Sequence, residues 1–316
     1  MNSPKVSVIL PTYNAAPHLA KAIDSILGQT FHDFELIVIN DGSTDDTLGV
    51  LAKYTDPRIV VITQDNLGLP ITLNKGISVA RGIYLARQDA DDISRPQRLQ
   101  LQVNFMDQHP TYGLVGCWTQ IVTPEGSTTR QHTHPVNNGQ LQIQLLINNQ
   151  FVHSSVMLRT SCLKISGTYS ENPEHFPPED YDLWLRIAKH YQVGNIPEVL
   201  LEYLELPTSI SRTKETLIND RAEKMAREAI FCIPGLNQNM GNINTLIKVG
   251  NGRPVKLTLS QYLSQLNLIS KLQEYINKRF PGEEVEIAKG AKFLRIQMHK
   301  ALIKSFIRRF TNTFHD

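Results

Sequence analysis

The sequence predicts an α/β fold, in which helices flank a mainly parallel sheet and a helical extension follows at the C-terminus. Short β-branched runs recur along the first hundred residues, segments with helical spacing lie between them, and polar residues follow each run. Strands that alternate with helices of this length form right-handed β-α-β units with parallel strands. We therefore expect the first part of the chain to be a ligand-binding half of an α/β domain.

The predicted strands are rich in Val, Ile and Leu, and they span Val6 to Leu10, Glu35 to Ile39, Ile59 to Ile62 and Ile83 to Ala86. Each predicted helix between them has a start or stop signal. Pro17 opens the first helix and Gly28 ends it. Ser43 and Asp46 have the spacing of a capping box, which predicts a second helix from this point. Apolar residues at helical spacing predict a third helix from Leu69 to Val79.

Polar residues follow every predicted strand, at Pro11 to Asn14, Asn40 to Ser43, Thr63 to Asn66 and Asp89 to Asp92. The carboxyl ends of parallel strands share one edge of a sheet, and ligands bind outside that edge. The first turn has neither the G-x-G-x-x-G pattern of a dinucleotide site nor a Walker-type loop. Bound phosphates would therefore need a metal ion.

The stretch Asp89-Ala90-Asp91-Asp92 is the strongest candidate for a metal site. Three carboxylates in four residues repel one another, so a fold keeps them where a cation neutralises them or where water covers them. Mg²⁺ is usually held by one or two carboxylates together with substrate phosphates. A solvated acidic turn that caps the next helix is the alternative, and the cluster alone does not decide between the two.

Two carboxylates, Glu179 and Asp180, begin a predicted helix, where the helix dipole favours their ionised form. They could cap the helix, or one of them could be a general base that takes a proton from an acceptor hydroxyl. His153 could contact a ligand or be a structural residue. Trp184 could be a sugar platform, although a place in the core is the stronger interpretation.

Composition and charge exclude several classes of protein. The chain has 316 residues, 41% of them hydrophobic, and 32 basic against 30 acidic residues give a net charge of +2, which does not favour nucleic acid as a partner. Three widely spaced cysteines predict a reducing compartment and no zinc site. Neither a signal peptide nor a membrane-spanning run is evident. We expect a cytoplasmic protein, either free or peripheral on the inner face of a membrane.

The C-terminal third is predicted to be helical. Asn and Gly are frequent in residues 234–254, which predicts a linker, and helical segments follow at Leu259 to Phe280 and Ala288 to Phe310. Residues 288–315 contain basic but no acidic residues, and Leu294, Met298, Leu302, Phe306 and Phe310 recur at four-residue steps. This pattern fits a helix that lies on anionic lipid through residues 288–316, or a helix that docks on the protein's own core.

Six motifs appear in order: Val-Ser-Val-Ile-Leu-Pro-Thr-Tyr-Asn (6–14), Ile-Asn-Asp-Gly-Ser-Thr-Asp (39–45), Leu-Asn-Lys-Gly-Ile (73–77), Ala-Arg-Gln-Asp-Ala-Asp-Asp (86–92), His-Ser-Ser-Val-Met-Leu-Arg (153–159) and Glu-Asp-Tyr-Asp-Leu-Trp-Leu-Arg (179–186). Together they resemble the inverting family 2 glycosyltransferases of the GT-A fold, over residues 5–211. The resemblance implies a GT-A domain at 1–211, with a nucleotide-sugar half at 1–110 and an acceptor half at 111–211. Residues 212–316 would be a helical region.

The resemblance also implies roles for individual residues. The nucleotide site would comprise Pro11, Thr12, Tyr13, Asp41, Asn66, Asp89 and Ala90. Asp41 would accept the uracil imide proton, and Asp91 would ligate Mn²⁺ or Mg²⁺, with Asp89 on the ribose side and beside the metal. Asp180 would be the catalytic base with Glu179 next to it. His153 and Trp184 would be acceptor or ligand contacts.

One segment departs from the family pattern. The family often shows Tyr-Arg-x-His-x-x-Ser-x-Ser near the end of the domain, where its basic residues approach the diphosphate. Here Tyr203 to Ser211 has Leu204 and Leu206 at those positions. Arg212 or a residue elsewhere would have to supply the missing charge, and without it reduced activity or none is expected.

These features favour a metal-dependent inverting transferase. It would move a sugar from a nucleotide sugar, such as a UDP-sugar, to a saccharide or lipid-linked saccharide in cell-surface glycan synthesis. A sugar-phosphate nucleotidyltransferase shares the α/β layout and the metal carboxylates, but it normally has a Gly-rich basic loop after the first strand. A non-catalytic partner protein that binds nucleotide sugar is the third hypothesis, and the missing Arg and His support it.

Overall fold

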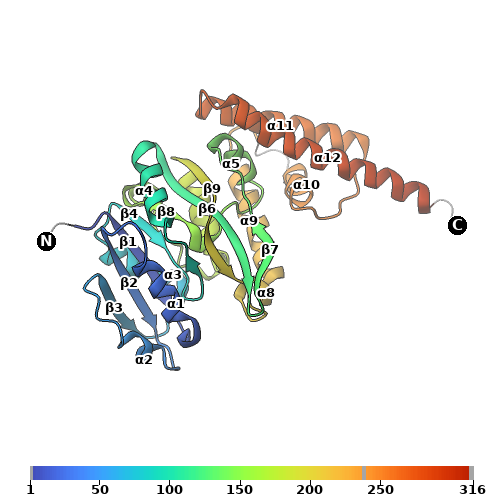
Figure 1. Cartoon of the computed structure of the whole chain (residues 1–316). Coiled ribbons are helices and arrows are strands. Elements are labelled where there is room, and N and C mark those ends of the chain that lie inside the picture. Colours follow the sequence, from blue (N-terminus) through green and yellow to red (C-terminus); the bar gives the residue numbers. More distant parts are fainter. Residues whose placement is uncertain (1–2, 237–239, 313–316) are drawn as a thin grey trace. The chain divides into compact units, whose positions relative to one another are not determined.

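The computed structural model describes residues 3–236 and 240–312 and divides into two compact units, each taken by itself below. Unit 1 comprises Met1–His134 and Phe151–Glu215, and unit 2 comprises Pro135–Gln150 and Thr216–Asp316. Both units are therefore built from two separate stretches of chain. Figure 1 shows the strands in the first two thirds of the sequence and long helices in the last third.

Four parallel strands form the first half of the sheet in unit 1: β1 (Val6–Thr12), β2 (Phe34–Asp41), β3 (Ile59–Gln64) and β4 (Tyr84–Arg87). They lie in the order β3-β2-β1-β4. Every residue of β1, β2 and β4 is buried, as expected for strands covered on both faces. The four predicted β-branched runs and their parallel arrangement are confirmed.

The helices that follow these strands are α1 (Ala16–Leu27), α2 (Thr47–Leu51), α3 (Leu69–Val79) and α4 (Arg98–Gln108). The predicted capping box at Ser43 is wrong, because α2 begins at Thr47 without a side-chain cap bond. The Ser43 hydroxyl instead accepts a hydrogen bond from the Asn14 N–H at 3.0 Å. It thereby links the loop after β2 to the loop after β1, which keeps this edge of the sheet together.

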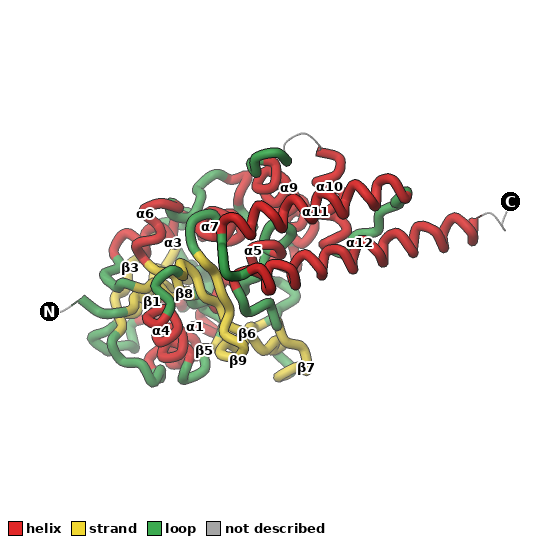
Figure 2. The backbone as a smooth tube through the Cα atoms, turned by 90° about the horizontal axis from the view of Figure 1, so that it is seen from above, coloured by secondary structure: helices red, strands yellow, loops and turns green. Residues whose placement is uncertain are grey.

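The second half of the sheet makes it mixed. Its strands are β5 (Ile93–Ser94), β6 (Tyr112–Thr123), β7 (Gly126–His132), β8 (Met157–Arg159) and β9 (Gln192–Leu204). The described part of the sheet has the order β3-β2-β1-β4-β8-β6-β9-β5, with β7 paired to β6. Strand β8 is antiparallel to both neighbours, while β6 and β9 are parallel. Figure 2 shows these strands side by side, with helices on both sides.

Short helical segments lie between or after the strands of this half: η1 (His153–Ser155), η2 (Thr160–Cys162), α6 (Leu163–Ser166), η3 (Pro173–His175), α7 (Glu179–Ala188) and α8 (Ile210–Thr213).

Helix α1 shows how the core forms, because Leu19, Ile23 and Ile26 recur at helical spacing and are completely buried. Burial of such side chains contributes about 1.5–3 kcal/mol each.

Unit 2 is helical and consists of α5 (Asn138–Gln144), most of α9 (Glu215–Phe231), α10 (Met240–Gly250), α11 (Leu259–Arg279) and α12 (Glu284–Asn312). Helix α5 comes from the middle of the sequence and packs against α12. The linker predicted at 234–254 is wrong, because α10 lies within it. Ile243, Leu246 and Ile247 recur at helical spacing among the Asn and Gly residues and are buried, which explains why this stretch folds as a helix.

The apolar side of α12 faces the interior of unit 2. Leu294, Met298 and Leu302 are buried, so for these residues the core-docking alternative is correct and the lipid-facing one is wrong. Phe306 is 42% exposed, and the side chain of Phe310 lies outside the described residues. No helix among residues 3–236 and 240–312 has both the length and the apolar character needed to cross a membrane.

Candidate active site

The carboxyl ends of the four parallel strands bring the predicted nucleotide residues to one edge of the sheet. Pro11 and Thr12 end β1 and are buried, whereas the ring of Tyr13, just beyond, is 51% exposed. The Thr12 hydroxyl is buried without a hydrogen-bond partner among the described residues. An exposed aromatic ring beside an unsatisfied hydroxyl could contact a base and a sugar.

Asp41 ends β2 and is buried. Its Oδ1 accepts hydrogen bonds from Gln64 Nε2 at 2.8 Å and from the Leu67 N–H at 2.9 Å, and its Oδ2 accepts one from the Gly68 N–H at 2.9 Å. A carboxylate can accept about four hydrogen bonds, so one position remains for a ligand N–H. Asn66 is exposed, and its backbone lies so close to Gly42 that a Cβ there would meet the Asn66 nitrogen at 2.5 Å.

The acidic turn after β4 gathers three carboxylates. One ligand atom from each of Asp89, Asp91 and Asp92 lies within 4.8 Å of the others. Burial, with the Asp89 charge adding to it, raises the pKa of Asp91 to about 6. Burial and the other two carboxylates also raise the pKa of Asp92 well above its usual range. Hard oxygen ligands that repel one another in a poorly solvated position fit a divalent cation, which would relieve the repulsion.

Asp92 differs from its two neighbours, because it is almost completely buried. Its Oδ1 accepts a hydrogen bond from the Leu204 N–H at 2.8 Å, and its Oδ2 accepts one from the Ser154 hydroxyl. Asp89 and Asp91 are only half-buried, and Ala90 between them is buried. Asp92 therefore ties the acidic turn to η1 and to the end of β9, while Asp89 and Asp91 are the carboxylates available to a ligand.

Helix α7 presents Glu179 and Asp180 at its first turn, and both are buried. The Tyr181 N–H donates to Asp180 Oδ1 at 2.8 Å. Glu179 Oε1 lies 3.4 Å from His153 Nδ1, and the other ring nitrogen of His153 is 2.8 Å from the Tyr169 hydroxyl. Tyr169 and His153 thus hold the first carboxylate of the helix in place.

Arg87 lies where the two groups of carboxylates converge. It is the last residue of β4, is almost completely buried and forms an ion pair with Asp89. The charges of Asp89 and Glu179 both act on its guanidinium. Tyr169 lies in the same region: burial raises the pKa of its hydroxyl, Arg87 opposes that shift, and Glu179, Asp180 and Asp89 add to it. The acidic turn and the start of α7 therefore face one shared neighbourhood in unit 1.

The remaining predicted contacts divide into one possible site residue and one core residue. The side chain of His153 is 14% exposed, so it is accessible at the edge of this neighbourhood. Trp184 is completely buried and packs against His153 with ring centroids 5.9 Å apart. The suggestion that Trp184 contacts an acceptor is wrong, since a ligand cannot reach it, and its core alternative is correct.

Sequence reasoning gave no role to Arg87 or Tyr169, and it treated Asp92 only as one of the three carboxylates of the candidate metal site. The available signal for Arg87 was its position directly after the apolar run that ends at Ala86. A strand that is buried on both faces accepts a charged residue only where a partner neutralises the charge. Tyr169 follows Gly167 in a loop, and no pattern in that loop indicates that it returns to His153.

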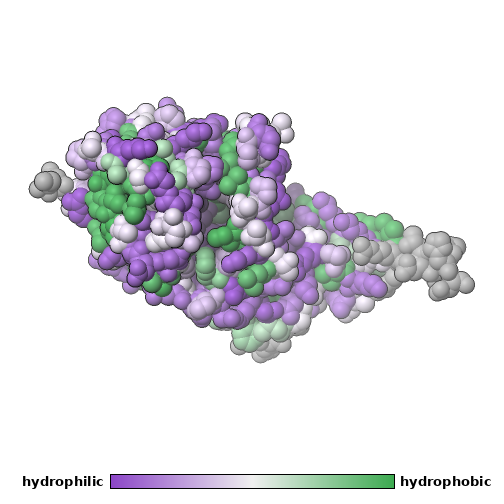
Figure 3. Space-filling model, turned by 90° about the horizontal axis from the view of Figure 1, so that it is seen from below, coloured by the Kyte–Doolittle hydropathy of each residue, from purple (hydrophilic) through white to green (hydrophobic). Residues whose placement is uncertain are grey.

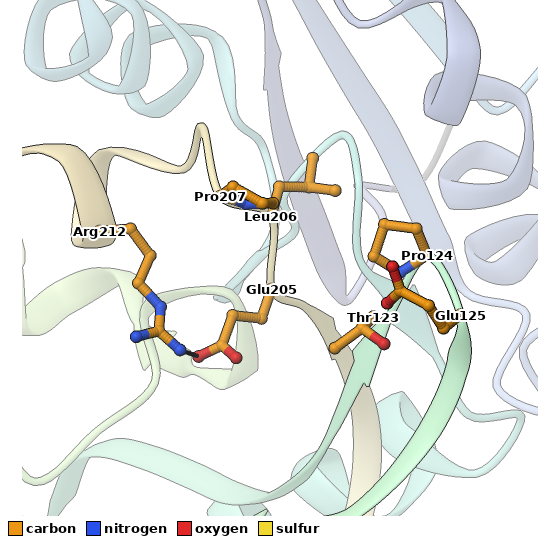
Figure 4. Close-up of a pocket in the computed structure, with 7 residues that line it drawn as sticks. All are labelled: Thr123, Pro124, Glu125, Glu205, Leu206, Pro207 and Arg212. Carbon is orange, nitrogen blue, oxygen red and sulfur yellow. Dashed lines mark ion pairs between the residues drawn. The ribbon is translucent and has the colours of Figure 1, made fainter.

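A cavity of about 390 Å³ opens where the β6–β7 hairpin meets the segment after β9 (Figure 4). It is lined by Thr123, Pro124, Glu125, Glu205, Leu206, Pro207 and Arg212. Arg212 Nη2 lies 2.7 Å from Glu205 Oε1, and Arg130 Nη2 lies 2.5 Å from Glu205 Oε2. Arg212, the suggested replacement for the missing basic residues, is therefore paired with a carboxylate. The Leu204 N–H donates a hydrogen bond to Asp92 of the acidic turn, and the next residue, Glu205, lines this cavity.

Comparisons with known proteins agree with this arrangement. The sequence model of Glycosyl transferase family 2 matches residues 7–164. The chain is 34% identical to EpsE of Bacillus subtilis over 70% of this chain and 81% of that protein. It is 32% identical to the O-antigen biosynthesis glycosyltransferase WbnJ of Escherichia coli, over 63% of this chain and 78% of that protein.

Two solved structures share the fold. TarS 1-349 of S. aureus, in complex with UDP-GlcNAc, has a TM-score of 0.60 at 16% identity and covers 93% of this chain and 90% of its own. The mannosyltransferase PcManGT of Pyrobaculum calidifontis, in complex with GDP-Man and Mn²⁺, has a TM-score of 0.59 at 17% identity and covers 97% of this chain and 88% of its own. These likenesses support the mixed α/β architecture of the GT-A fold.

Proposed function

Because the chain belongs to glycosyl transferase family 2 and is a glycosyltransferase, we propose that it transfers a sugar from a UDP-sugar to a hydroxyl group with inversion at the anomeric carbon. The acceptor would be a saccharide or a lipid-linked saccharide in the synthesis of a cell-surface polysaccharide. The O-antigen relative and the neighbour that binds UDP-GlcNAc support this choice of pathway and donor.

A single observation carries the proposal: Arg87 pairs with Asp89 of the acidic turn and also feels the charge of Glu179, which His153 and Tyr169 hold at the start of α7. An inverting displacement needs a base on the acceptor side and neutralisation of charge on the leaving-group side. The two groups of carboxylates could serve these two purposes from one neighbourhood. No such pairing would exist if the groups lay on opposite sides of unit 1.

On the donor side, Asp91 and Asp89 would hold Mn²⁺ or Mg²⁺, and the neighbour that contains Mn²⁺ supports this assignment. A divalent cation bound there would offset the charge of the departing diphosphate. Arg87 offsets part of the negative charge of the turn, and the hydrogen bonds that Asp92 accepts hold the turn in place. Tyr13 and the free acceptor position of Asp41 would contact the uracil ring.

On the acceptor side, Asp180 would take the proton of the attacking hydroxyl. The acceptor oxygen then forms a bond to the anomeric carbon while the bond from that carbon to the diphosphate oxygen breaks, and the diphosphate leaves with the electron pair. Glu179 lies beside the base and is positioned by His153. His153, being partly exposed, is the residue of this pair that could also contact the acceptor.

The test is release of UDP from a panel of UDP-sugars with Mn²⁺, measured for Asp180→Asn and Asp91→Asn. A general base contributes about 10²–10⁴-fold to a rate, so Asp180→Asn is expected to lower kcat by at least 10²-fold. Asp182→Asn, in the same helix turn, and Asp33→Asn, just before β2, are the matched controls. Activity that survives both active-site substitutions unchanged would refute the proposal.

One observation favours a non-catalytic alternative. Arg212, the suggested replacement for the family's basic residues, is paired with Glu205. Tight UDP binding without turnover of any donor would support a protein that only binds nucleotide sugar. Release of pyrophosphate from a nucleoside triphosphate would instead indicate a sugar-phosphate nucleotidyltransferase.

A further inference from the structure

Helix α12 has a second apolar side that faces away from the interior of unit 2. Ile296, Ile303 and Ile307 are 43%, 46% and 56% exposed. Their spacing of seven and four residues places them on one side of the helix, opposite the buried Leu294 and Met298. Exposed Phe293 and Phe306 flank these three isoleucines. We call these five residues the outer face of α12.

Lysines are interleaved with this outer face. Lys292, Lys300 and Lys304 are exposed, and no carboxylate of the described residues pairs with them. The sequence from residue 287 to residue 315 contains no Asp or Glu. Figure 3 shows hydrophobic side chains at the surface beside the grey end of α12, among hydrophilic ones. The outer face therefore combines apolar side chains with unneutralised positive charge.

A small cavity adjoins the lysines. It has a volume of about 110 Å³ and is lined by Val249, Gly252, Arg253, Pro254, Val255, Gln297, Lys300, Ala301, Lys304 and Ser305. A water molecule takes about 30 Å³ of liquid, so this space is large enough for an oxyanion such as a phosphate. The carboxylates of Glu223 and Asp220, at 2.9 and 3.5 Å from Arg253, engage that residue. Lys300 and Lys304 are therefore the two cations free to meet an anion there.

We propose that the outer face of α12 docks on the anionic surface of a lipid bilayer. The isoleucine and phenylalanine side chains would enter the boundary between headgroups and acyl chains, while Lys292, Lys300 and Lys304 would contact lipid phosphates. Charge complementarity selects this partner, because the exposed apolar residues alternate with unpaired lysines over residues 292–307. Interfacial helices have this combination of a polar, Lys-rich surface with large apolar side chains.

The proposal does not depend on the transfer reaction, since it concerns unit 2 and is measured without any donor sugar. It also differs from the sequence-based expectation, whose lipid-facing stripe included Leu294, Met298 and Leu302, which are buried. Deletion of residues 288–316 would not be a suitable test, because the same helix contributes Leu294, Met298 and Leu302 to the core of unit 2. Point substitutions on exposed residues leave that core intact.

The experiment is co-sedimentation of the full chain with vesicles of phosphatidylcholine alone or with 40% phosphatidylglycerol. We expect binding to the anionic vesicles and at least tenfold weaker binding to the neutral ones. The triple variant Ile296→Ser/Ile303→Ser/Ile307→Ser should lower the partition coefficient at least tenfold. Each Lys near an anionic surface is worth about fivefold in binding, so Lys300→Glu/Lys304→Glu should lower it by at least tenfold as well.

Matched controls come from exposed residues of unit 1: Ile165→Ser, whose side chain is 61% exposed, and Lys189→Glu. Both should bind vesicles like the unaltered protein, and far-ultraviolet circular dichroism should show equal helix content in all variants. Equal binding of the triple isoleucine variant, or equal binding to neutral vesicles, would overturn the proposal. A self-associating protein whose isoleucine variant becomes monomeric without vesicles would also overturn it, because the outer face would then join two copies of the chain.

Discussion

Arg87 is a buried cation that feels the charges of both groups of carboxylates, and its Nε has no hydrogen-bond partner among the described residues. Removing one partner of a buried pair leaves an uncompensated charge, which costs about 3–5 kcal/mol when burial is complete. Asp89 is 32% exposed, so a smaller loss is expected. Arg87→Met should lower the free energy of unfolding by about 2–3 kcal/mol in EDTA, as measured by urea denaturation.

The double variant Arg87→Met/Asp89→Asn is the control for this prediction. Removing the Asp89 charge as well should recover part of the lost stability, since the uncompensated carboxylate is then gone. A double variant that is no more stable than Arg87→Met would mean that the arginine acts through packing and not through charge.

His134 gives a pH dependence of stability. Burial lowers the pKa of its ring to about 4, and the neighbouring His132 adds to this shift. The ordinary value of 6.5 applies in the unfolded chain, so between pH 6.5 and 4 the unfolded state binds more protons and stability falls as the pH falls. From pH 7 to pH 5 this one group should cost about 2 kcal/mol.

Urea denaturation of His134→Gln at the two pH values checks this expectation. The variant should lose about 2 kcal/mol less than the unaltered protein between pH 7 and pH 5. His32→Gln, which changes an exposed histidine, is the control and should behave like the unaltered protein. Equal losses in all three proteins would show that His134 does not titrate differently in the folded state.

The candidate site shows how far single residues could be predicted. Asp89, Asp91, Glu179 and Asp180 stand in short motifs, and the structure brings both motifs to the same neighbourhood. Their chemical roles stay predictions. Tyr169 could not be found, because its position depends on the path of a loop that returns to His153 from sixteen residues away. Trp184 lies in an acidic helix start but is buried, which only the packing of unit 1 reveals.

The contact between α5 and α12 gives a prediction for elements. The Gly139 N–H and the Asn138 side chain both donate to the Glu283 carboxylate, at 2.5 and 2.9 Å. A Cβ at Gly139 would lie 2.8 Å from both the nitrogen and Cγ1 of Ile287. Backbone atoms cannot move aside easily, so Gly139→Ala should destabilise this helix pair by about 1–3 kcal/mol.

Hydrogen exchange of peptides from α5 and α12 measures this effect. Faster exchange is expected in both helices of Gly139→Ala, and unit 1 should exchange as before. Gln140→Ala, one position along the same helix, is the matched control and should leave the exchange unchanged. Protection of α12 that is the same in Gly139→Ala would show that the helices can separate enough to accept a methyl group.

Helices and strands could be predicted where a single local sequence pattern dominates. The β-branched runs of the parallel strands and the long C-terminal helices were identified from local patterns and are confirmed. Helix α10 was missed because the frequent Asn and Gly residues of this stretch are typical of a linker, although apolar residues at helical spacing lie among them. The orientation of α12 was unresolved because both of its sides carry apolar residues, and the positions of α5, α10 and α11 decide which side is covered.

For the molecule as a whole, ligand binding should raise thermal stability only when a cation is present. At a UDP concentration of about 100 times Kd, binding adds about 2.7 kcal/mol to the free energy of unfolding. For a domain of about 200 residues this corresponds to a rise in Tm of roughly 5–10 °C. We expect this rise with UDP and Mn²⁺, and its loss in EDTA, because Asp89 and Asp91 would hold the cation that meets the diphosphate.

Differential scanning fluorimetry with and without Mn²⁺ measures the shift. Asp91→Asn should lose most of the metal-dependent part, while Asp33→Asn should retain it. A shift of equal size in EDTA would contradict the role proposed for the acidic turn, although it would leave nucleotide binding itself in place.

The route of the chain through its two units has a consequence for biosynthesis. Helix α5 leaves the ribosome early, but the helix that covers its apolar residues, α12, begins at residue 284. At translation rates of about 5–20 residues per second, roughly ten to thirty seconds pass before that partner emerges. During this interval the nascent chain exposes Leu141, Ile143 and Leu145. Chaperones that recognise short apolar segments therefore have a defined time window and a defined target in this protein.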